Sequence, residues 1–156
     1  MFLEVGALKE LTLQAQQGHL CGIPTKFAKT IHVGHSFGSV ITNTLTAMFP
    51  DISKGVVLTG FSQIGNYLAD FALGGNFVPV AENPALAEKY ALGYVAPKSM
   101  VGVQINFFGP GDFDPKILDA ASMTGQPVTY GELLTLASGA TMSSFAGPVL
   151  IISGGM

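Results

Sequence analysis

Five consecutive residues, Gly34-His35-Ser36-Phe37-Gly38, have the pattern G-x-S-x-G, in which the serine hydroxyl can act as a nucleophile. This chemistry needs a strand that enters a helix through a turn so tight that the serine side chain projects from it. The small residues Gly34 and Gly38, two before and two after Ser36, allow such a turn to close. The chain has 20 glycines, so the pattern alone is a modest signal and the flanking elements decide its meaning.

In this pattern Ser36 would project its hydroxyl above the sheet. Phe37 follows at the start of a helix, where its backbone N–H and the positive helix end would stabilise an oxyanion. The alternative interpretation is a glycine-lined turn between a strand and a helix that carries an incidental serine.

A helix is predicted at residues 3–17, before the serine. Apolar side chains recur there at steps of three and four residues, and Gly18 follows where a helix would stop. The pattern indicates an amphipathic helix whose apolar face consists of Leu3, Ala7, Leu8, Leu11 and Ala15.

The serine pattern itself lies between two predicted strands. Residues 30–33 are short and rich in β-branched side chains, and we expect this strand to end at Gly34. A helical run follows over residues 37–49, closed by Pro50. Residues 55–59 then form a continuous apolar run of the kind that is buried in a parallel sheet. This order of elements predicts a βαβ unit.

Residues 61–147 contain short helical pieces separated by glycine and proline, and no clear strand is predicted before residues 149–153. Asn83 and Asp114 each precede a proline, which indicates a helix N-cap. Thr129 and Glu132 have the spacing of a capping box. The segment is therefore predicted to be a helical insertion between two strands of a parallel sheet.

Residues 31–39, 55–60 and 148–154 resemble strands 5, 6 and 7 of the α/β-hydrolase fold of the AB hydrolase-1 type, and residues 61–147 resemble its helical lid. The resemblance implies a partial α/β-hydrolase fold with a helical cap inserted between strands 6 and 7. The expected domains are a core at residues 1–60, a cap at 61–147 and a return strand at 148–156. The implied activity is hydrolysis of a carboxylic ester, thioester or related acyl compound through an acyl-enzyme on Ser36, with neither a metal nor an organic cofactor.

Important parts of that family's triad have no match in this sequence. The family order is serine, acid, histidine, whereas His19, His32 and His35 all precede Ser36. We expect His32 and His35 to pack in the core and His19 to lie in a linker. No triad base is therefore identified in the chain.

The triad acid is also missing from the positions where the family carries it. It usually follows strand 7, but only Gly154, Gly155 and Met156 come after that strand, and no carboxylate follows strand 6. Asp112 and Asp114 lie in the predicted lid, where a turn and a helix cap account for them.

The oxyanion loop and several strands of the family are missing before Ser36, and one lost oxyanion donor lowers the rate by about 10²- to 10³-fold. The sequence is therefore interpreted as a fragment or truncated gene product, weakly active or inactive alone. Its first strand, left unpaired, would be an aggregation hazard.

The amino-acid composition limits the classes of partner that we expect for this chain. The chain is 48% hydrophobic and 11% charged, has a formal net charge of −3 and contains no arginine, so a nucleic acid partner is not expected. The single cysteine, Cys21, is predicted to be a small buried side chain. We find neither a targeting segment nor a membrane span, which favours a cytoplasmic protein.

Three alternatives compete with the hydrolase hypothesis. A P-loop enzyme is disfavoured because residues 34–39 lack the required lysine. An acyltransferase can share the pattern, but the arginine that holds its acyl group has no counterpart. The third is a non-catalytic ligand-binding module. The hydrolase hypothesis predicts a small lipophilic ester as substrate, with an apolar pocket lined by Phe71, Phe77, Tyr90, Tyr94, Phe107, Phe108 and Phe113, although simple packing also explains these aromatic residues.

Overall fold

The computed structural model describes residues 1–63, 65–139 and 142–154. The chain divides into two compact units, one made of Met1–Gly65 with Thr135–Met156 and the other of Asn66–Leu134. Both units contain helices and strands, and the chain has a mixed α/β fold.

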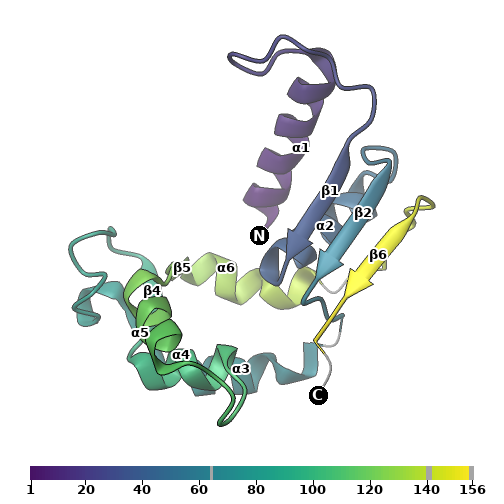
Figure 1. Ribbon diagram of the computed structural model, residues 1–156. Helices are drawn as coiled ribbons and strands as arrows, with labels where there is room; N and C mark the ends of the chain where they lie inside the picture. The colour runs from purple at the N-terminus through teal and green to yellow at the C-terminus, as the bar shows by residue number, and fades with distance from the viewer. Residues whose placement is uncertain (64, 140–141, 155–156) are drawn as a thin grey trace. The chain divides into compact units, whose positions relative to one another are not determined.

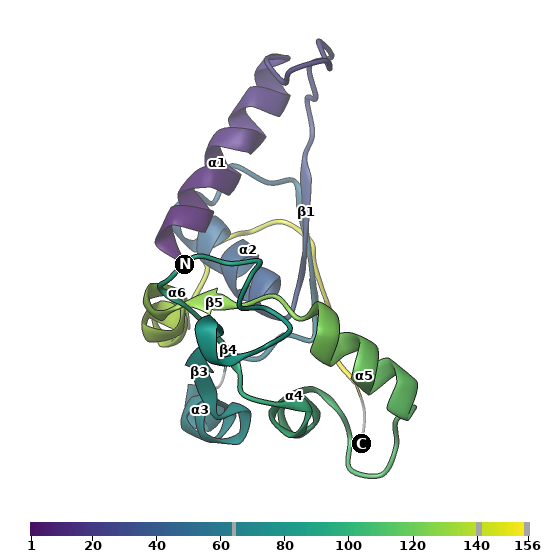
Figure 2. The same cartoon turned by 90° about the vertical axis from the view of Figure 1, so that its left-hand side faces the viewer.

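The first unit contains a parallel three-stranded sheet in the order β1-β2-β6 (Figure 1). Figure 2 views this sheet nearly edge-on, with helices α1 and α2 on the same side of it. The elements of this unit are α1 (Phe2–Gln17), β1 (Ile31–His35), α2 (Phe37–Met48), β2 (Gly55–Thr59), the 3₁₀ helices η1 (Gly65–Tyr67, shared with the other unit) and η3 (Leu136–Gly139), and β6 (Val149–Ile152).

The predicted βαβ unit is confirmed, with small shifts at the ends of three elements. Strand β2 has the predicted bounds, and α2 and β6 end one residue before theirs. Strand β1 does not stop at Gly34 but continues to His35, because both residues stay in parallel register with β2. The serine therefore follows the last strand residue directly.

Helix α1 forms where predicted and ends at Gly18, which adopts a left-handed conformation with φ of 75°. The predicted apolar face is right only in part, because Leu8 packs against the core whereas Leu3 and Leu11 are exposed. The buried positions are Val5 and Thr12. A polar residue can face the sheet here because the Thr12 hydroxyl donates to the Leu8 carbonyl at 2.7 Å and its oxygen lies 2.9 Å from Nε2 of His32 on β1.

The core of the first unit joins α1, α2 and the loop that follows α2. Met1, Val5, Leu45 and Ile52 form it, and each is at most 8% exposed. The sheet is covered unevenly. Along β1 the side chains alternate between exposed and buried, whereas all four residues of β6 are exposed.

The second unit contains a small antiparallel sheet in the order β3-β4-β5, together with several helices. Its elements are α3 (Leu68–Gly75), β3 (Phe77–Pro79), η2 (Val80–Glu82), β4 (Tyr94–Pro97), α4 (Met100–Phe107), α5 (Pro115–Thr124), β5 (Val128–Thr129) and α6 (Tyr130–Thr135). The prediction of a purely helical segment without strands is therefore wrong. These strands have two to four residues, too few for an alternating pattern to appear.

Two of the three predicted helix starts in this unit are confirmed. The Asp114 carboxylate accepts a hydrogen bond of 2.8 Å from the backbone N–H of Lys116 at the start of α5. Thr129 and Glu132 form a reciprocal capping box, with backbone to side-chain distances of 2.6 and 3.1 Å. Asn83 caps a turn rather than a helix, since its side chain accepts a hydrogen bond from Ala85 N–H in a segment of turns.

Candidate nucleophile site

Ser36 occupies a strained backbone conformation between β1 and α2, with φ of 51° and ψ of −117°. Asn76 also has positive φ, but its φ of 45° and ψ of 59° are the ordinary left-handed values that asparagine tolerates at a helix C-cap. Ser36 lies outside that region, and such a conformation costs about 1–3 kcal/mol that the surrounding structure must offset.

The two glycines of the pattern are not equivalent. A Cβ atom added to Gly34 would lie 2.4 Å from the carbonyl oxygen of Gly38 and 2.6 Å from the Cα atom of Ser39, which backbone atoms cannot accommodate. At Gly38 an added Cβ meets nothing within 4 Å among the described residues. The prediction that the turn needs two small residues therefore holds for Gly34 and is wrong for Gly38.

Thr59, the last residue of β2, holds the turn from the neighbouring strand. Its carbonyl oxygen accepts hydrogen bonds of 2.9 Å from the backbone N–H of Ser36 and from the buried Ser39 hydroxyl. The Thr59 hydroxyl donates to the carbonyl of Gly34 at 3.1 Å and is 2.8 Å from Nδ1 of His35. The sequence places Thr59 on a strand but does not show its register with His35, so this role was missed.

The Ser36 side chain is exposed at the carboxyl end of β1. Within the described part of the chain, its hydroxyl has no hydrogen-bond partner and the backbone N–H of Phe37 has no acceptor. The free Phe37 N–H follows from its position in the first turn of α2, where backbone donors lack an intrahelical partner. Both groups are therefore open to a ligand.

The histidines differ from one another. His32 is 7% exposed and lies between two hydroxyls, with Nε2 2.9 Å from Thr12 Oγ1 and Nδ1 2.9 Å from Ser53 Oγ. Burial lowers the pKa of His32 because the charged ring would lose solvation. The prediction of core packing is confirmed for His32 but wrong for His35, which is exposed because the odd-numbered residues of β1 face the open side of the sheet. His19 is exposed just after α1.

Other candidate groups lie apart from Ser36 in the chain. Asp112 and Asp114 belong to the second unit. The Asp114 carboxylate already accepts a hydrogen bond as the N-cap of α5. Cys21 is exposed in the turn after α1, so the prediction of a buried thiol is wrong. That turn lies outside both hydrophobic cores, and its backbone leaves the side chain in solvent. Among the described residues, no cluster of histidine, cysteine, aspartate and glutamate could hold a metal ion.

The aromatic residues of the second unit pair with one another. Phe71 lies 5.6 Å from Phe77 and 5.8 Å from Phe107, measured between ring centroids. The other pairs are Tyr90 with Tyr94 and Phe108 with Phe113. These contacts show packing between neighbouring rings, while a role in lining a substrate pocket stays a prediction.

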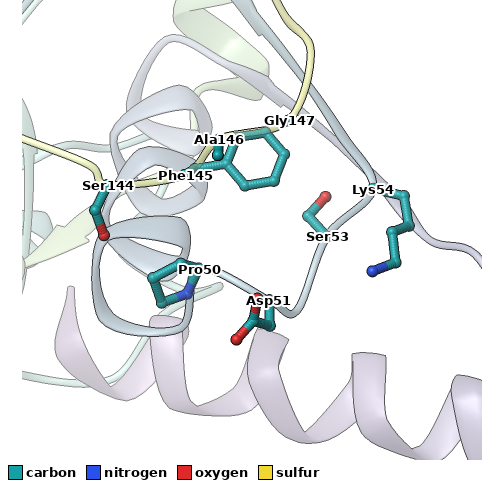
Figure 3. A pocket seen from close by; sticks show the side chains of 8 residues that line it. All are labelled: Pro50, Asp51, Ser53, Lys54, Ser144, Phe145, Ala146 and Gly147. Atoms are coloured by element: carbon teal, nitrogen blue, oxygen red, sulfur yellow. The ribbon is translucent and has the colours of Figure 1, made fainter.

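A cavity of about 250 Å³ lies in the first unit, away from Ser36. Figure 3 shows the loop before β2 on one side of it and the segment before β6 on the other. Both segments precede their strands, whereas Ser36 follows β1, so the cavity and the serine lie at opposite ends of the parallel sheet. Its lining residues are Pro50, Asp51, Ser53, Lys54, Ser144, Phe145, Ala146 and Gly147.

No helix in the described ranges combines the length and the apolar character needed to cross a membrane. Models of known protein families do not match the chain, and no curated protein is similar enough to it to count as a relative.

Proposed function

We propose that this chain is a serine hydrolase with a partial α/β-hydrolase fold, which acts on a carboxylic ester or related acyl compound through Ser36. One observation carries the proposal, namely the φ of 51° and ψ of −117° at Ser36 between a parallel strand and a helix. This strained conformation has no packing purpose for an exposed serine, whereas a nucleophile elbow needs a strained turn that exposes the serine hydroxyl.

Two further features support the proposal. The N-terminus of α2 leaves the backbone N–H of Phe37 without an acceptor among the described residues, so it can stabilise an oxyanion. The serine also lies at the carboxyl end of a parallel sheet, where ligands bind in open α/β sheets. The substrate that we propose is a small lipophilic ester.

The alternative is a non-catalytic ligand-binding module. It is favoured by one observation, that no histidine or carboxylate in the described residues hydrogen-bonds the Ser36 hydroxyl. Without a general base the serine reacts slowly, although an oxyanion donor and substrate binding alone retain part of the rate enhancement. We therefore expect weak reactivity from this chain by itself.

A fluorophosphonate probe tests the proposal, because an activated serine displaces fluoride from its phosphorus atom. We expect mass spectrometry to find the adduct on Ser36 of the folded chain and to find none in Ser36→Ala. Heat-denatured chain is the matched control, since unfolding removes the strained turn but keeps the serine. Labelling that is equal before and after denaturation, or spread over other serines, would contradict the proposal. A folded chain that binds esters reversibly without any adduct would favour the binding module.

A further inference from the structure

The hydroxyl of Thr59 has two neighbours but only one hydrogen to donate. It donates to the carbonyl of Gly34 at 3.1 Å, and its oxygen lies 2.8 Å from Nδ1 of His35. Both contacts can be hydrogen bonds at the same time only when Nδ1 is the donor to the hydroxyl oxygen. The neutral His35 ring then carries its hydrogen on Nδ1 and a lone pair on Nε2.

The ring is held close to the backbone of Ser36. A Cβ atom added to Gly60 would lie 3.5 Å from Cε1 of His35 and 3.8 Å from the backbone nitrogen of Ser36. The ring and the serine backbone therefore border the same small space next to Gly60. His35 is exposed, and its Nε2 has no hydrogen-bond partner among the residues that the structure describes.

We infer that Thr59 is a positioning residue for the serine site, one that orients the His35 ring and leaves Nε2 as a hydrogen-bond acceptor beside Ser36. The acceptor fits an acyl substrate that carries a hydroxyl or N–H group near its acyl carbon. Thr59 thus acts on the site in two ways. Its carbonyl oxygen accepts a hydrogen bond from the turn at Ser36, and its hydroxyl orients the His35 ring. The substrate named in this inference rests on the proposed function. The orientation and the tautomer of the His35 ring do not depend on it.

Nitrogen NMR of the His35 ring is the first test, at a pH where free histidine is neutral. The signal is assigned by its loss in His35→Asn. We expect the hydrogen on Nδ1 in the wild type and in Thr59→Ser, which keeps the hydroxyl, and a mixture of tautomers in Thr59→Val, which lacks it. A wild-type ring with its hydrogen on Nε2 would overturn the inference, and so would a folded Thr59→Val with the wild-type tautomer.

The labelling rate of Ser36 by the fluorophosphonate probe is the second test. With a fluorophosphonate probe that carries a hydroxyl or N–H group near its phosphorus, loss of one hydrogen bond to Nε2 corresponds to about a fivefold change, so we expect Thr59→Val to label about fivefold more slowly than Thr59→Ser. Equal rates in these two variants would overturn the positioning role. Absence of labelling in the wild type, together with the expected tautomer, would reject the proposed hydrolase and leave the orientation of the ring supported.

Discussion

At the residue scale, the turn at Ser36 depends on one glycine far more than on the other. Gly34→Ala forces a Cβ atom to within 2.4 Å of the Gly38 carbonyl oxygen, and we expect it to lower the free energy of unfolding by at least about 2 kcal/mol. Gly38→Ala is the matched control, because it has open space and a place in the first turn of α2. We expect it to be neutral or to stabilise by about 0.5 kcal/mol. Urea unfolding measures both, and equal losses would show that the turn is built differently.

His32 makes the stability depend on pH. Its pKa in the folded chain is lowered by burial, so below the unfolded-state value of about 6.5 the unfolded chain binds a proton that the folded chain resists. The contribution of His32 is therefore fully present above that pH and is lost as the pH falls toward the folded-state pKa. We expect the stability to fall by at most about 1.4 kcal/mol per pH unit more than in His32→Gln. Parallel stability profiles for the two proteins would refute this assignment.

The sequence predicted the candidate site in part. Gly34 and the placement of Ser36 between a strand and a helix followed from a local pattern, because the turn is made by consecutive residues. The contributions of Thr59 and of Thr12 come from other elements, at 23 and 20 residues from Ser36 and His32 respectively. Such contacts depend on strand register and helix rotation, which a local pattern does not specify.

At the element scale, the face that α1 turns inward is set by its packing on α2 and by the contact of Thr12 with His32 rather than by Leu3 and Leu11. Val5 is 1% exposed and belongs to the core, whereas Leu11 is 54% exposed. We expect Val5→Ala to cost about 2 kcal/mol of stability, and Leu11→Ala to change it by less than about 0.5 kcal/mol. Thermal unfolding of the two variants checks this order. A larger loss of stability in Leu11→Ala than in Val5→Ala would instead support the apolar face that was predicted from the sequence.

The elements of the first unit were easier to predict than those of the second, for a physical reason. Strand β2 is buried along its length and reads as a continuous apolar run bounded by Gly55 and Gly60. Strands β3 and β5 are much shorter and only partly buried, so no clear alternation marks them. In the second unit, predictions from helix caps were more accurate than predictions from periodicity. Asp114 and the Thr129–Glu132 pair form hydrogen bonds with residues close to them in the sequence, which a local pattern can show.

At the scale of the whole molecule, the parallel sheet has one open face, and its other face is covered at β1 and β2 but exposed at β6. Parallel sheets are normally covered on both faces. Here Val33 on β1 and Ile152 on β6 are 70% and 51% exposed, and both belong to the open face, since β1 and β6 both pair with β2 in parallel register. The open face and the apolar edge strand β6 leave backbone groups and large side chains available to other chains.

We therefore expect the purified chain to associate through this sheet as its concentration rises. A double substitution, Val33→Glu with Ile152→Glu, places charges on the open face and should lower the association, with little loss of stability because both side chains are exposed. Leu92→Glu with Leu134→Glu is the matched control, since these residues are 88% and 81% exposed, lie in the second unit and add the same two charges to the net charge of −3. Light scattering across a concentration series measures the effect. If the control reduces association as much as the sheet variant does, general charge repulsion is the cause and the open face is not the site of association.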